Sequence, residues 1–145
     1  MRKYSIALVA VVIVTAVSSA DEDAVKAEIK SLEGTWQLVS ATKDGKKTPE
    51  DVVKKIRVVI QGNKHSVYFE DKVVAKDVSF TLDPKKNPKT TTDTLPDGKE
   101  IKGIYKLDGN TLTSCVAEVG KDRPSEFDSK PGSGHTLRVF KRVKP

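Results

Sequence analysis

The side chains that most often carry chemistry are few and far apart in this sequence. It contains two histidines, His65 and His135, and one cysteine, Cys115. A metal site usually needs three or four ligands, and a catalytic nucleophile needs a base beside it. The spacing of these residues indicates neither arrangement, and no Gly-x-Ser-x-Gly motif or phosphate-binding glycine loop is present. We therefore expect no catalytic residues, no metal site and no cofactor, and an enzyme is the least favoured of three functional hypotheses.

Cys115 and the acidic residues near it have simpler explanations than catalysis. Cys115 lies in an alternating strand pattern with no histidine nearby in sequence, which favours a small buried residue over a reactive thiol. A lone cysteine forms no internal disulfide, so the core alone must stabilise the fold. Asp122, Glu126 and Asp128 lie in a polar segment, where carboxylates are ordinarily solvated.

The charge of the chain is positive but diffuse. There are 26 lysines and arginines against 20 acidic residues, a formal net charge of +6. The lysines are scattered among acids rather than gathered in one block, which is typical of a solvated surface and not of a nucleic-acid-binding face. We expect no nucleic-acid partner.

Residues 1–20 have the layout of a secretory signal peptide. Arg2 and Lys3 form a basic start, Ile6–Val14 is a nearly unbroken apolar run, and Ser18–Ala20 supplies small residues before Asp21. We expect cleavage here, export to the periplasm or the exterior, and no stable membrane insertion of the domain 21–145 afterwards. An uncleaved anchor is the alternative, although the run is shorter than the roughly 20 residues that span a bilayer.

Hydrophobic periodicity then predicts a leading helix and a series of short strands. Apolar residues at helical spacing, with acids first and lysines later, predict an amphipathic helix from Asp21 to Glu33. Thr48, as a cap before Pro49, predicts a short second helix to Lys55. Alternating residues predict about eight strands, near positions 34–42, 56–60, 65–69, 78–82, 90–95, 101–107, 112–116 and 137–142.

Tight turns join most of these strands, and Asp108-Gly109 is a strong hairpin signal. Strands and helices do not alternate, so a parallel α/β fold is disfavoured. About eight antiparallel strands must close into a barrel or split into two layers. We expect a mainly β, eight-stranded antiparallel barrel with a short N-terminal helix. The inward-facing candidates for ligand contact are Leu38, Val58, Ile60, Val67, Phe69, Phe80 and Tyr105.

The start of the first strand carries a recognisable motif. Gly34-Thr35-Trp36 follows a short helix, and basic residues lie in the final strand. Together with the strand count, this resembles the lipocalin-like proteins. The resemblance implies that Trp36 lies over the closed end of the barrel and that a late arginine covers its ring. Arg142 is the candidate for that role and Arg138 is its rival, and a guanidinium on an indole contributes roughly 0.5–2 kcal/mol.

A closer resemblance extends over nearly all of residues 21–145. It rests on motifs in order along the chain: 32–40 (LEGTWQLVS), 102–105 (KGIY), 108–112 (DGNTL), Cys115, Gly120, 123–127 (RPSEF) and 130–134 (KPGSG). The chain resembles the uncharacterised lipocalin-like domain family of small exported proteins in planctomycete-type bacteria. The resemblance implies fold and export but no activity. The chain departs from typical lipocalins in lacking a disulfide pair.

Two functional hypotheses remain besides the enzyme. The first is a module that binds a small apolar ligand inside the barrel, and an apolar cavity of about 300 Å³ or more would favour it. The second is a structural or interaction domain with a filled barrel and an unidentified protein partner. Its contact surfaces would be the lysine-rich loop 85–89 and the loop 120–135, which carries Arg123, Pro124 and Phe127. That second loop is long enough to be a lid or a surface Ω-loop pinned by Phe127.

Overall fold

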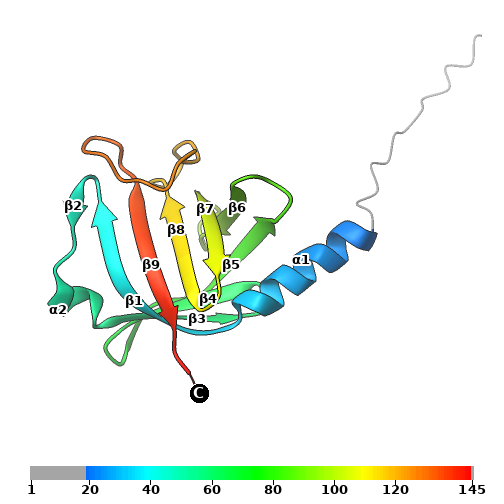
Figure 1. The fold of residues 1–145 in the computed structure, drawn as a ribbon, viewed down its shortest axis with the longest axis horizontal. Coiled ribbons are helices and arrows are strands. Elements are labelled where there is room, and N and C mark those ends of the chain that lie inside the picture. The colour runs from blue at the N-terminus through cyan, green and yellow to red at the C-terminus, as the bar shows by residue number, and fades with distance from the viewer. Residues whose placement is uncertain (1–18, 145) are drawn as a thin grey trace, which may run out of the picture.

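The computed structural model describes residues 19–144, which form two helices and nine strands (Figure 1). Helix α1 covers Ser19–Leu32, and the four-residue helix α2 covers Glu50–Val53. The strands are β1 (Gly34–Lys43), β2 (Lys46–Lys47), β3 (Ile56–Gln61), β4 (Lys64–Phe69), β5 (Lys72–Asp83), β6 (Lys89–Thr94), β7 (Glu100–Asp108), β8 (Thr111–Val116) and β9 (Thr136–Arg142).

The strands form a closed antiparallel meander. From β3 to β9 each strand pairs with the next along the chain, β1 pairs with β3, and β1 also pairs with β9. The last pairing closes the sheet into an eight-stranded barrel, while the two-residue β2 pairs only with the end of β1. The expected mainly β, eight-stranded antiparallel barrel with a short N-terminal helix is therefore confirmed.

The side chains alternate between the barrel interior and its outer surface, as the period of a strand requires. A continuous core runs from α1 through the inward faces of the strands, and Trp36 at its base has no exposed surface. The buried members of this core are Leu32, Trp36, Leu38, Ala41, Val53, Ile60, Phe80, Tyr105, Leu112 and Phe140.

Helix α1 packs against the barrel through its C-terminal half. Leu32 is buried in the core, and Ile29 packs beside it. The Glu28 carboxylate accepts hydrogen bonds from the Tyr105 hydroxyl at 3.0 Å and from Lys89 Nζ at 2.7 Å. These contacts place the end of the helix across one end of the barrel, and Figure 1 shows its N-terminal half projecting beyond the strands.

The connecting segment 117–135, between β8 and β9, packs on the outer wall of the barrel. The Arg123 guanidinium donates to the carbonyls of Thr91 and Gly103 and to the Thr92 hydroxyl. Pro124 is buried. Beneath this segment the outward-facing Ile104 and Cys115 are 1% and 0% exposed. The segment is thus pinned mainly by Arg123 and Pro124, while the Phe127 ring is half-buried under Lys106.

Thr48 does not cap the second helix: Pro49 is the cap residue, and the Thr48 amide donates instead to the Ala41 carbonyl beside β2. The expected signal peptide lies mostly outside the described residues, since only Ser19 and Ala20 belong to α1. Neither helix within residues 19–144 has the length and apolar character that a membrane crossing requires.

Candidate functional site

The base of the barrel is sealed by an indole and a guanidinium. Trp36 pairs with Arg142 across β1 and β9, and the guanidinium carbon lies 4.3 Å from the centroid of the indole ring. The indole Nε1–H donates to the Leu32 carbonyl at 2.8 Å. Arg142 donates to the carbonyls of Glu33 at 2.6 Å and Ser31 at 2.7 Å. A Cβ on Gly34 would come within 3.1 Å of Arg142 Nη1, and the φ of Gly34 is +126°, so glycine suits this position.

Above this base the barrel is hollow. One cavity of about 120 Å³ extends over the inward faces of β3 to β9 and down to Leu32. A neighbouring cavity of about 290 Å³ lies between β1, β3, β4 and β9. The two share Val58, Val67, Arg138 and Phe140 in their walls, so they adjoin one another inside the barrel. The larger one is close to the size expected of a small-ligand site.

Six of the seven side chains proposed from sequence as ligand contacts line these cavities. Those six are Leu38, Val58, Ile60, Val67, Phe80 and Tyr105. Phe69 is the exception. It lies at the end of β4, outside both cavity walls, and Lys55 Nζ lies 5.8 Å from its ring centroid. Alternation along β4 places Phe69 on the same face of the strand as Val67. Because β4 ends at Phe69, its ring lies beyond the part of the strand that lines the cavities.

A histidine and an aspartate from two different strands contact each other in the cavity wall. His65 Nε2 on β4 lies 2.9 Å from Asp93 Oδ2 on β6, and the two side chains are 20% and 21% exposed. The imidazole packs against Phe80, with ring centroids 5.9 Å apart. His65 Nδ1 is buried and has no hydrogen-bond partner among residues 19–144. His65 Nδ1 is thus a polar atom at the cavity wall that forms no hydrogen bond with the described residues.

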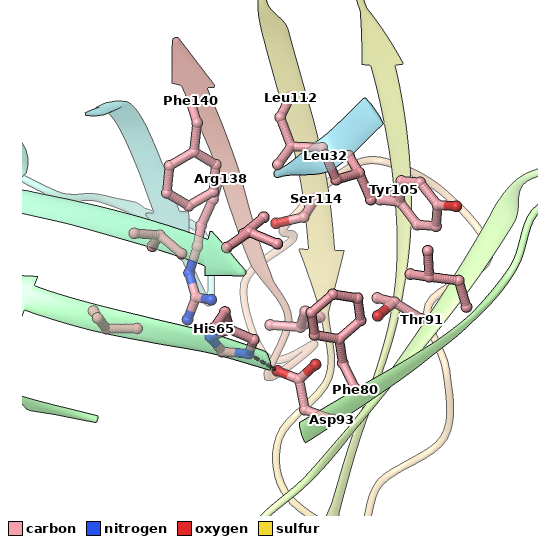
Figure 2. Close-up of a pocket in the computed structure, with 15 residues that line it drawn as sticks. Leu32, His65, Phe80, Thr91, Asp93, Tyr105, Leu112, Ser114, Arg138 and Phe140 are labelled. Atoms are coloured by element: carbon pink, nitrogen blue, oxygen red, sulfur yellow. Dashed lines mark hydrogen bonds and ion pairs between the residues drawn. The ribbon is translucent and has the colours of Figure 1, made fainter. Parts of the chain in front are cut away.

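Arg138 on β9 brings a positive charge into the hollow. Figure 2 shows it entering the cavity from the strand that also supplies Phe140, in the same group of side chains as His65 and Asp93. The Arg138 side chain is classed as exposed, and the surface it exposes lines the hollow inside the barrel wall. Burial lowers the pKa of Arg138, and the charge of Asp93 opposes that effect. Among the described residues its guanidinium has no hydrogen bond and no ion pair.

Arg138 also lies at the inner edge of the barrel mouth. A third cavity of about 500 Å³ lies at the rim, where β6, β7, β8 and β9 meet segment 117–135. Lys43, Asp93, Glu118 and Arg138 line it together with apolar residues. Arg138 is therefore common to the walls of the cavity at the mouth and of both inner cavities.

Cys115 and Tyr105, two other groups able to do chemistry, are engaged by hydrogen bonds within the protein. Cys115 Sγ donates to the Asp128 carbonyl at 3.2 Å, and burial raises the pKa of the thiol. Burial and the Glu28 carboxylate raise the pKa of Tyr105 far above its ordinary value. No three His, Cys, Asp or Glu side chains within residues 19–144 are grouped so that they could hold a metal ion.

Sequence reasoning missed Arg138, His65 and Asp93 as contributors to the interior. The inward position of Arg138 could have been predicted, because it lies two residues before the inward-facing Phe140 on the same strand. His65 and Asp93 lie 28 residues apart on strands separated by β5, so no local spacing could join them.

No protein-family model matches the chain, and comparison with curated proteins gives no match. The class that the fold defines is a closed eight-stranded antiparallel β-barrel with a hollow interior, and this architecture is consistent with a lipocalin-like domain.

Proposed function

We propose that the barrel binds a small, mainly apolar ligand in its interior. The observation that carries this proposal is the pair of adjoining cavities walled by apolar side chains from most strands of the barrel. An eight-stranded barrel has an interior just wide enough either to be filled by its own side chains or to hold one small ligand. In this barrel the side chains leave part of the interior unfilled.

The cost of the hollow supports a binding role over a purely structural one. Side chains around an unfilled interior lose packing contacts that larger side chains would make, and this loss lowers the stability of the fold. A few larger side chains in place of Val58, Val67 or Ser114 would remove that cost. A domain whose only task is to be stable or to present its outer surface gains nothing from the cavity, whereas a ligand-binding domain requires it.

The size of the hollow limits the ligand. Pockets for drug-sized molecules are roughly 300–1,000 Å³, and the inner cavities lie at or below the lower end of that range. A single hydrocarbon chain or a small aromatic molecule of two or three rings fits the two adjoining cavities better than a larger polycyclic molecule. We therefore expect affinities on the order of micromolar, since a small ligand has few atoms to contribute.

A neutral fluorescent probe tests the proposal. Titration with N-phenyl-1-naphthylamine should give saturable fluorescence enhancement with the intact protein. Val67→Phe places a ring in the wall common to both inner cavities and should weaken binding at least about 10-fold. Val73→Phe is the matched control, because Val73 lies on the neighbouring strand β5 and is 48% exposed. No saturable binding to the intact protein, or equal binding to the two variants, would refute an interior site and favour the interaction-domain alternative.

We also propose that the domain is lipocalin-like and acts outside the cytoplasm. The indole–guanidinium seal of Trp36 and Arg142 supports the first statement. The basic start, apolar run and small residues of positions 1–20 support the second. N-terminal sequencing of the protein recovered from its own host should give Asp21 as the first residue. A chain that still begins with Met1 would argue for the uncleaved anchor instead.

A further inference from the structure

Among the described residues, the middle of the barrel carries a positive charge that no direct contact neutralises. Arg138 has five N–H donors on its guanidinium, and within residues 19–144 none of them reaches an acceptor. The neighbouring acid, Asp93, has Oδ2 engaged by His65 at 2.9 Å. The exposed surface of Arg138 faces the hollow, so a molecule that enters the hollow can reach these unpaired donors.

We propose that Arg138 binds the carboxylate head of the ligand, whose apolar tail lies between Arg138 and the Trp36 end of the barrel. This inference rests on the proposed function and specifies its ligand class: a small carboxylic acid with one hydrocarbon chain or ring. A carboxylate matches the planar guanidinium fork with two parallel hydrogen bonds, which a neutral head group cannot do.

The order of residues along β8 and β9 supports this orientation. Val116 pairs with Thr136 at the mouth, Ser114 with Arg138 in the next inward layer, and Leu112 with Phe140 below. Polar and charged side chains therefore lie at and above the level of Arg138. On these two strands the side chains beneath it, Leu112 and Phe140, are apolar, as is Leu32 at the base of the barrel. A head group at Arg138 keeps its charge near the mouth, while the tail is removed from water at a gain of about 25 cal/mol per Å² of apolar surface.

His65 and Asp93 complete the electrostatic setting. Asp93 alone would repel an anion, but its charge is shared with His65 through their 2.9 Å contact. His65 Nδ1, which also borders the hollow, has no hydrogen-bond partner among residues 19–144.

Isothermal titration with a matched pair of ligands, decanoate and decan-1-ol, at pH 8 tests the proposal. Both have the same chain, and only the first has an anionic head. We expect the intact protein to bind decanoate roughly 10- to 100-fold more tightly than decan-1-ol, the range that a charge-assisted contact provides. Arg138→Met should lose that preference while still binding decan-1-ol. Lys141→Met removes the same charge from the outward face of the same strand and should leave both affinities unchanged.

Each outcome decides something different. Equal affinity of the intact protein for the two ligands would overturn the carboxylate inference and leave apolar binding standing, and this comparison does not depend on the folding of any variant. Decanoate binding that survives in Arg138→Met would also overturn it. Failure of the intact protein to bind either ligand, with N-phenyl-1-naphthylamine binding also absent, would remove the proposed function itself.

Discussion

Arg142 joins three parts of the molecule through one side chain. It lies on the Trp36 ring at 4.3 Å, and it donates to the carbonyls of Ser31 and Glu33 at the end of α1. The last carbonyls of a helix lack partners within the helix, so Arg142 supplies hydrogen bonds that the backbone cannot. The final strand thereby fixes both the first strand and the preceding helix.

Removal of Arg142 should therefore be costly. We expect Arg142→Met to lower the free energy of unfolding by about 2 kcal/mol, because it leaves helix carbonyls without their charged donor and the indole without its cation. Urea unfolding followed by the fluorescence of Trp36, the sole tryptophan, measures this. Arg57→Met is the control: its guanidinium lies 5.2 Å from the Tyr68 ring on the exposed surface and should cost less than about 0.5 kcal/mol. Similar small losses in both variants would contradict the role given to Arg142.

Some of these residues were predictable and others were not. The positions of Trp36 and Arg142 could be predicted because the resemblance to lipocalin-like proteins implies an indole at the closed end of the barrel with an arginine from the last strand over its ring. Arg138 was considered only as a rival for the indole, since a charge on an inward strand face contradicts the usual pattern of apolar residues inside. Its alternation with Phe140 was the better guide. The contact of His65 with Asp93 depends on barrel curvature, which sequence spacing does not report.

At the scale of elements, segment 117–135 behaves as a cover for the outer wall of the barrel. Its packing buries Cys115 completely, and burial raises the pKa of that thiol, so less of the reactive thiolate is present at a given pH. In the native protein we expect 5,5′-dithiobis(2-nitrobenzoate) to react with Cys115 far more slowly than in urea.

Arg123→Met should speed this reaction at least about 10-fold, because it removes the hydrogen bonds that hold the segment to β6 and β7. Lys121→Met, at an exposed position of the same segment, is the control. A native thiol that reacts at the unfolded rate would mean that the segment does not cover the wall in solution.

The boundaries of elements show where sequence periodicity is sufficient. Strands whose inner residues are apolar and whose outer residues are polar agreed with expectation to within one or two residues, as in β1 and β9. Strand β5 runs from Lys72 to Asp83, whereas only 78–82 was expected. Its first half includes exposed Val73 and Val74 in succession and a positive φ at Asp77, so neither alternation nor a turn signal marks its true start.

At the scale of the whole molecule, two buried acids set the response of stability to alkaline pH. The pKa values of Tyr105 and Cys115 are both raised in the folded state, chiefly by burial. Above the ordinary pKa of each group, near 10 for tyrosine and 8.5 for cysteine, the unfolded chain loses the proton while the folded chain keeps it. The folded state then binds more protons, so stability falls as pH rises.

The expected slope is up to about 1.4 kcal/mol per pH unit for each group above those values, with a flat profile near neutrality. Urea unfolding at pH 7, 9 and 10.5 measures it. Tyr105→Phe should remove the contribution that begins near pH 10 while retaining the contribution from Cys115, which begins near pH 8.5. A variant with the same pH profile as the parent would show that the phenol is not protected by the fold.

The closure of the barrel by β1 and β9 has a mechanical consequence. The two strands are antiparallel, and Trp36 lies opposite Arg142, so the start of β1 and the end of β9 meet at the same edge of the sheet. A force that pulls these two ends apart acts across the strands and loads one pair of hydrogen bonds at a time. We expect the β1–β9 pairing to open one hydrogen-bonded pair after another at low force. The hairpins on the opposite side of the barrel should stay folded until β1 and β9 have separated.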